Sequence, residues 1–192
     1  MLKRVLVAWK VCAIALLFAT SLAISAETKS DRGGKLSDDD ADFVKEAAAA
    51  GMAEVELGKM AAEKGSSKQV KDFGQRMQKD HTKANEELKK LVGNKGVQLP
   101  TELDRKHKSA SERLAKLSGD EFDREYMRAM VDDHKETLEK FQRQADKGKD
   151  PDLKKFASEQ VPRLKKHLEL AQTTQKQVAG SGKGASPAKS AK

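Results

Sequence analysis

Residues 73–81 read FGQRMQKDH and residues 126–134 read YMRAMVDDH. Both segments carry an aromatic residue, a methionine and a histidine at intervals of four, namely Phe73, Met77 and His81, then Tyr126, Met130 and His134. Residues four apart lie on one face of an α-helix. Because that face also carries the large apolar residues, we expect both histidines to point into a core. Two helical hairpins with inward imidazoles are one way in which a four-helix bundle builds a metal or cofactor site.

The flanking sequence predicts four long helices. Apolar seams bounded by caps and turns place them at about residues 37–65, 66–93, 119–147 and 151–179. A shorter helix is expected from Thr101 to about Leu117, in the connection between the two hairpins. Pro162 should kink the last helix or leave the carbonyl of Ser158 without its helical partner. The sequence therefore predicts an all-α fold, a four-helix bundle of two long hairpins joined by a crossover that contains a short helix.

The first 26 residues have the pattern of a secretory signal peptide. A positively charged start precedes an apolar segment at residues 11–24, and Ala26 ends a small-residue cleavage point, with Ala23 as the alternative. Lys10 limits the apolar run to 14 residues. This run is shorter than the roughly 20 residues that a membrane-spanning helix needs, which disfavours a membrane anchor. The sequence thus predicts export to the periplasm or cell envelope.

Charge and cysteine content narrow the function classes. Nearly all of the formal net charge of +8 lies in residues 1–36 and 180–192, so the predicted bundle at 37–179 is close to neutral. This argues against a nucleic-acid partner. Residues 27–36 are expected to form a flexible linker, and residues 180–192 a disordered basic tail that could contact the cell envelope. The single cysteine, Cys12, lies in the predicted signal, so the mature chain has no thiol ligand or disulfide.

Each long helix carries one potentially coordinating side chain on its apolar seam. Counted from the hairpin turns, these four residues fall near the middle of their helices and thus at one level: Glu54, His81, His134 and His167. The sequence predicts a metal site with these four ligands, for a transition metal such as Cu, Zn or Fe. The alternative is a purely structural layer of hydrogen bonds between glutamate and histidine, because a single seam histidine is usually a core residue bonded to a neighbour.

Other residues near this level could assist the site. Carboxylates flank the seam positions and could orient the imidazoles or simply face water: Glu56, Asp80, Asp133 and Glu169. Met77 and Met130 lie one turn from two of the histidines and would suit a soft ion such as Cu(I), although methionine more often serves as core packing. His107 lies between two lysines, so we expect it to be exposed and assign it no role.

The chain resembles a widespread bacterial family of exported, ferritin-like helical proteins of unknown function, often labelled predicted outer-membrane proteins. The resemblance covers about residues 38–175 and rests on Ala47-Ala48, Glu54-Val55-Glu56-Leu57-Gly58, Phe73, Arg76-Met77, Asp80-His81, Gly96-Val97, Leu99-Pro100, Phe122-Asp123, Tyr126-Met127, His134, Pro162, Leu164 and His167-Leu168. It implies a ferritin-like bundle and an envelope location, and it supplies no established activity. Di-iron ferritins use Glu-x-x-His on two helices. Here the residues three before each histidine are Gln78, Val131 and Leu164, which disfavours a carboxylate-bridged di-iron centre.

Three functions are compatible with these patterns. The favoured one is a non-enzymatic metal-binding or stress-related envelope protein. The second is a structural or interaction module whose polar layer fixes helix register. The third, a redox or oxygen-activating enzyme, needs more carboxylates than the seam offers. The chain has no nucleophile elbow and no glycine-rich phosphate loop, so no catalytic or organic-cofactor residues are assigned.

Overall fold

The structure, a computed structural model, describes residues 35–181. The predicted signal peptide lies outside the described residues, as do all of the predicted linker except Lys35 and Leu36 and all of the predicted tail except Gly180 and Ser181. Five helices make up the described part: α1 (Asp38–Lys64), α2 (Lys68–Val92), α3 (Arg105–Ala115), α4 (Gly119–Lys147) and α5 (Pro151–Ser181). No strand occurs within residues 35–181, which confirms the predicted all-α class.

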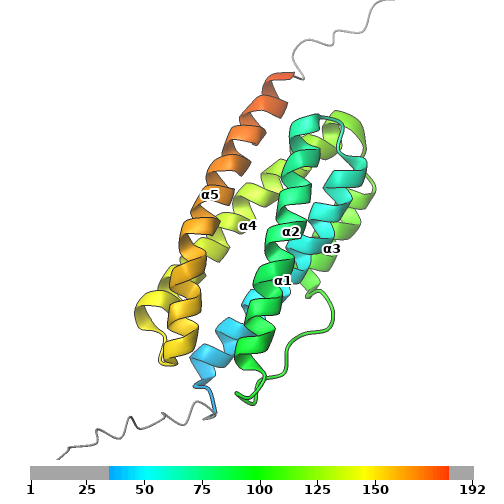
Figure 1. The fold of residues 1–192 in the computed structure, drawn as a ribbon. Helices are drawn as coiled ribbons and strands as arrows, with labels where there is room; N and C mark the ends of the chain where they lie inside the picture. The colour runs from blue at the N-terminus through cyan, green and yellow to red at the C-terminus, as the bar shows by residue number, and fades with distance from the viewer. Residues whose placement is uncertain (1–34, 182–192) are drawn as a thin grey trace, which may run out of the picture. The chain divides into compact units, whose positions relative to one another are not determined.

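The helices pair as two long hairpins. The most extensive packing is between α1 and α2 and between α4 and α5, and the two hairpins meet through sparser contacts of α1 with α4 and of α2 with α5. Figure 1 shows α3 beside the first hairpin, on the crossover that leads from α2 to α4. This arrangement confirms the predicted ferritin-like bundle with one long connection. Among the described helices, none is both long and apolar enough to cross a membrane.

Local capping chemistry explains where the long helices begin. The hydroxyls of Ser37 and Ser67 accept hydrogen bonds from backbone amides in the first turns of α1 and α2. Asp150 Oδ1 accepts from the amides of Asp152 and Leu153, both at 3.0 Å, so Pro151 takes the first helical position of α5. The break predicted at Ser118-Gly119 is confirmed, because α4 begins at Gly119 with a φ of +58°.

The short helix in the crossover begins later than predicted. Residues 101–104 are not helical, and the N-cap is Asp104, whose carboxylate accepts a hydrogen bond of 2.9 Å from the amide of His107. The expected start at Thr101 was therefore wrong. Aspartate is a strong N-cap, and its position three residues before His107 sets the first turn of α3.

A close approach of two glycines fixes the spacing of the first hairpin. A Cβ added at Gly74 would lie 2.5 Å from the carbonyl oxygen of Gly58, and one added at Gly58 would lie 2.7 Å from the carbonyl oxygen of Gly74. Both distances are shorter than carbon and oxygen tolerate without backbone movement. The backbones of α1 and α2 therefore meet directly here, one to two turns from Glu54 and His81.

A polar layer divides the apolar core into two clusters. The first cluster includes Leu57, Phe73, Met77 and Tyr126. The second includes Phe43, Leu88, Phe141, Phe156, Leu164 and also Leu36, which lies in the range expected for the linker. On every long helix the predicted seam residue falls between these clusters, so the polar layer lies at mid-height of the bundle and has apolar walls on both sides.

Candidate metal centre

The four predicted seam residues are all buried in this layer. Glu54 on α1, His134 on α4 and His167 on α5 are 1–2% exposed, and His81 on α2 is 9% exposed. Helical spacing places each on the inward face of its helix, because the residues one turn away belong to the apolar clusters. The number of residues between each hairpin turn and its seam residue therefore predicted correctly that the four side chains lie at one height in the bundle.

The three imidazoles form a nearly equilateral triangle. Their ring centroids are separated by 5.8 Å (His81–His134), 5.5 Å (His81–His167) and 5.6 Å (His134–His167). Three rings directed at one ion through metal–nitrogen bonds of about 2.0–2.1 Å have centroids roughly 5–6 Å apart. One coordinating atom from each ring lies within 4.8 Å of the other two. Among the described residues, this trio is the group of potential ligands close enough to share one ion.

Each imidazole has one ring nitrogen that is buried without a hydrogen-bond partner, namely His81 Nε2, His134 Nε2 and His167 Nδ1. The other nitrogen of two rings is fixed from outside the triangle. His134 Nδ1 donates to the carbonyl of Met130 at 2.9 Å, and His167 Nε2 donates to Asp80 Oδ2 at 3.0 Å. These donations leave a lone pair on the unpartnered nitrogens. Metal-binding histidines are typically held by an outer acceptor in this way.

Burial keeps the three imidazoles neutral. It lowers the pKa of His81 well below the ordinary value of 6.5, and repulsion from His134 and His167 lowers it further. Burial, together with repulsion from His167, lowers the pKa of His134 to about 4. For His167, burial lowers the pKa and outweighs the opposing effect of Asp80. Neutral imidazole is the form that coordinates a metal ion, so little proton competition is expected at neutral pH.

Glu54 lies beside the triangle and not in the group of three ligands. Its Oε1 is 3.4 Å from His134 Nδ1, the nitrogen that also faces Met130, and neither carboxyl oxygen accepts a hydrogen bond. Burial raises the pKa of Glu54 well above its ordinary value, and the negative charge of Asp133 and a hydrogen bond between the two carboxyl groups raise it further. The buried hydroxyl of Tyr126 is also unpartnered. This side of the layer therefore holds several polar atoms whose hydrogen-bonding capacity is unused.

Among the flanking carboxylates, Asp80 of α2 orients the imidazole of His167, which lies on α5. Glu56 instead accepts a hydrogen bond of 2.6 Å from the hydroxyl of Ser111 on α3. Met77 and Met130 are both buried in the first apolar cluster, which agrees with their use as core packing.

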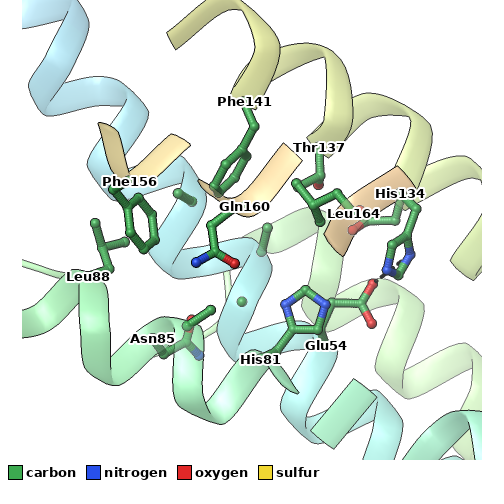
Figure 2. Close-up of a pocket in the computed structure, with 15 residues that line it drawn as sticks. Glu54, His81, Asn85, Leu88, His134, Thr137, Phe141, Phe156, Gln160 and Leu164 are labelled. Carbon is green, nitrogen blue, oxygen red and sulfur yellow. Dashed lines mark ion pairs between the residues drawn. The ribbon is translucent and has the colours of Figure 1, made fainter. Parts of the chain in front are cut away.

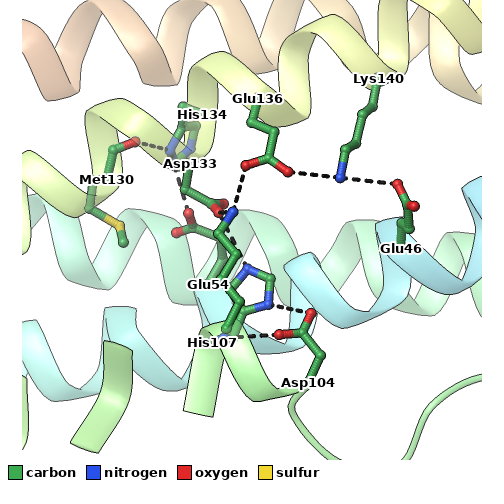
Figure 3. A network of polar contacts seen from close by, with 10 residues as sticks. Glu46, Glu54, Asp104, His107, Met130, Asp133, His134, Glu136 and Lys140 are labelled. Atoms are coloured by element: carbon green, nitrogen blue, oxygen red, sulfur yellow. Dashed lines mark hydrogen bonds and ion pairs between the residues drawn. The ribbon is translucent and has the colours of Figure 1, made fainter. Parts of the chain in front are cut away.

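His107 differs from the sequence-based expectation. It is 8% exposed and not solvent-facing, because α3 presents it to α4. Its Nδ1 lies 2.8 Å from Asp104, and its Nε2 lies 3.3 Å from Asp133 (Figure 3). The spacing of His107, Ser111 and Leu114, all buried, is the helical pattern that could have revealed this face.

A chain of charged groups continues from His107 along the outside of the layer. Lys106 forms an ion pair with Glu136 at 2.6 Å. Lys140 joins Glu136 to Glu46 of α1 (Figure 3). Burial would raise the pKa of Asp133, but His107 and Lys106 lower it to about 2. Asp133 therefore stays a carboxylate that ties α3 to α4.

A small cavity adjoins the histidine layer, and we call it the core pocket. Its volume is about 30 Å³. Glu54, His81 and His134 line it beside Asn85, Gln160 and apolar side chains such as Leu88 and Phe156. In Figure 2 the polar residues Glu54, His81 and His134 lie on one side of the view, and the apolar residues Leu88 and Phe156 lie on the other. Sequence reasoning did not anticipate Asn85 and Gln160 as pocket residues.

The fold and the site define an all-α bundle protein with a buried trio of histidines. The chain belongs to the family described as a domain of unknown function (DUF4142), whose profile matches residues 25–174 and so includes all four seam residues. No curated protein is significantly similar in sequence. A similar solved structure is the crystal structure of a DUF305 fragment from Deinococcus radiodurans, with a TM-score of 0.66 and 12% sequence identity. The match covers 74% of this chain and 99% of that one, and at this identity it supports the fold alone.

Proposed function

We propose that the protein is a non-enzymatic metal-binding protein of the periplasm or cell envelope. It holds one transition metal ion through His81, His134 and His167. The observation that carries this proposal is the set of three unpartnered ring nitrogens in one buried triangle. Each buried polar atom without a partner costs about 1–3 kcal/mol. Three together are a large share of the roughly 5–15 kcal/mol that stabilises a domain, so a bound ion would remove a substantial penalty.

The donor set indicates the class of metal. Three neutral imidazoles suit Zn, Cu or Fe, whereas Mg and Ca prefer oxygen ligands. The sequence predicted Glu54 as a fourth ligand, but Glu54 faces His134 Nδ1 and would have to turn to reach an ion held by the unpartnered nitrogens, so the proposed protein ligands are the three histidines. The envelope location rests on the signal-like residues 1–26 and on the family resemblance.

A structural or stress-related interaction module is the second candidate. Asp80 and the carbonyl of Met130 already satisfy one nitrogen of two imidazoles, and buried water could satisfy the remaining polar atoms. In that case the glutamate–histidine layer would specify helix register, and the surface and the tail would contact envelope partners.

Metal analysis distinguishes the two functions. The mature chain is purified without a histidine tag, equilibrated with Zn, Cu or Fe, and freed of loose metal before elemental analysis. We expect about one equivalent of bound metal, and none in the triple variant His81→Ala, His134→Ala, His167→Ala. The matched control is His107→Ala. It removes the one histidine of the chain that lies outside the trio, and this variant should keep the metal.

Equal and negligible metal in the wild type and in the triple variant would refute metal binding. The structural alternative predicts that His81→Leu folds well. It also predicts that metal changes the melting temperature of neither this variant nor the wild type. Circular dichroism confirms that each variant is folded.

A further inference from the structure

We propose that the metal centre keeps one exchangeable coordination position, which opens into the core pocket and takes water or a small anion of two or three atoms. This inference rests on the proposed function. It goes further by describing the centre as open to an external ligand, and it changes the role of Glu54 from a metal ligand to a partner of that external ligand.

The first observation is the incomplete ligand set. Zinc-like ions take four ligands, and the described residues place three coordinating side chains together. Structural zinc sites are closed by four protein ligands, whereas sites with three protein ligands keep the fourth position for water or substrate. Glu54 is the nearest additional ligand candidate, but its contact is with the outer nitrogen of His134. The fourth position is thus left to a small molecule.

The second observation is the cavity itself. The core pocket is lined by His81 and His134, two of the three ligands, and by Glu54. Space beside a buried metal position is what an exchangeable ligand requires. The remaining walls come from both hairpins and include half-buried residues such as Ala84 and Asn85, so the cavity extends from the layer toward the bundle exterior.

The third observation is the unsatisfied carboxyl of Glu54. The residue is 2% exposed, it lines the core pocket, and neither of its oxygens accepts a hydrogen bond. Its protonated form can donate to Asp133, which still leaves one oxygen as an unused acceptor. A water molecule or anion on the metal would give this carboxyl a partner inside the pocket. The layer would then contain fewer unpaired polar atoms than with the metal ion alone.

The size of the cavity limits the ligand. A cavity needs about 10–15 Å³ for one water molecule, so a volume of about 30 Å³ accommodates roughly two. Larger organic substrates do not fit. An ion bound by three neutral imidazoles keeps its positive charge in a buried site, which favours an anionic ligand over a neutral one of equal size. The carboxylate of Asp133, which also lines the core pocket, offsets part of this preference.

Cobalt(II) substitution with azide as the probe tests this inference. We expect azide to change the visible absorption bands of the cobalt protein in a saturable manner. Ala84→Leu fills the core pocket and should weaken azide binding at least about tenfold while cobalt affinity stays within about threefold. The matched control is Ala145→Leu, which adds the same volume at a half-buried position of α4 against the second apolar cluster. Its azide affinity should match that of the wild type.

The outcomes separate the inference from the proposed function. If cobalt binds but azide leaves the spectrum unchanged, the site is closed and the inference fails, while metal binding stands. If neither cobalt nor zinc binds, both fail. Glu54→Leu provides an independent test, because the inference predicts unchanged cobalt affinity and weaker azide binding. A loss of cobalt affinity of about tenfold or more would make Glu54 the fourth ligand and overturn the open position.

Discussion

At the scale of single residues, Asp80 is the clearest test of how the histidines are held. It lies on α2, one residue before His81, yet its carboxylate accepts a hydrogen bond from His167 of α5. This bond fixes the ring so that Nδ1 faces the triangle. We predict that Asp80→Ala weakens metal binding by about 10–100-fold, the usual effect of removing an outer partner of a metal-binding histidine.

Chelator competition measures this loss. The control is Asp132→Ala, which removes an exposed carboxylate of α4 that lies two residues before His134. A general effect of negative charge near the site would weaken metal binding in both variants. Equal affinities of Asp80→Ala and the wild type would show that Asp80 does not position His167.

His107 allows a pH-dependent prediction at the same scale. The hydrogen bond with Asp133 is the main cause that raises its pKa, and Asp104 raises the pKa further. Burial has the opposite effect but is outweighed. The neighbouring charges that face it are Asp104 beside α3 and Asp133 of α4, and Lys106 also contacts Asp133. A raised folded-state pKa means that the stabilisation is complete below about pH 6.5, the unfolded value, and is lost as the pH rises through the folded value.

We therefore predict that the advantage of the wild type over His107→Gln in unfolding free energy shrinks as the pH rises from about 6 to 9. Urea denaturation at a series of pH values measures this difference. Hydrogen exchange of α3 amides should show the same trend, because His107 holds α3 to α4. A constant difference across this range would mean that the histidine does not titrate in contact with Asp133.

At the scale of the elements, the glycine pair between α1 and α2 sets the geometry of the first hairpin. A Cβ at position 74 would lie 2.5 Å from the Gly58 carbonyl oxygen, and backbone atoms cannot give way as a side chain does. We predict that Gly74→Ala lowers the unfolding free energy by about 1–3 kcal/mol, despite the better helix propensity of alanine.

Gly93, the residue that caps the C-terminus of α2, provides the control. The nearest atoms to a Cβ there are two carbonyl oxygens at 3.6 Å, an ordinary contact. Gly93→Ala should leave stability unchanged or raise it slightly, because alanine reduces the entropy of the unfolded chain. Thermal and urea denaturation compare the two variants. If both lose the same stability, the close approach of α1 and α2 is not the cause.

The long helices are the features of this fold that the sequence predicts best. Periodicity and capping residues such as Ser37, Ser67 and Asp150 depend on local chemistry, so the long helices could be predicted from the sequence. The pairing of Asp80 with His167 depends on the relative rotation of α2 and α5, which spacing within one helix does not encode. The burial of His107 depends on how the crossover folds back, and its two lysine neighbours gave the opposite signal.

At the scale of the whole molecule, the level of the candidate site was predictable but its ligand geometry was not. Counting from the turns placed four seam residues at one height, because helices rise by a constant amount per residue. Which ring nitrogen faces inward depends on contacts that only the folded chain provides, such as the donation from His134 to Met130. The core pocket likewise arises where side chains of both hairpins leave a gap.

The position of the three histidines makes the metal a link between the two hairpins. His81 belongs to the first hairpin, and His134 and His167 belong to the second, while the contacts between hairpins are sparser than those within them. A ligand present at 100 times its dissociation constant stabilises the folded state by about 2.7 kcal/mol. For a chain of this size, that amount raises the melting temperature by roughly 5–10 °C.

We predict a rise of this size when zinc is added to the metal-free wild type, and its reversal by a chelator. His107→Ala should respond as the wild type does, because His107 contacts α3 and α4 outside the triangle. In His81→Leu, the link between hairpins is broken and zinc should have no effect on the melting temperature. Calorimetry measures all three proteins. A zinc response that survives in His81→Leu would place the metal elsewhere on the chain and remove the bridge between hairpins.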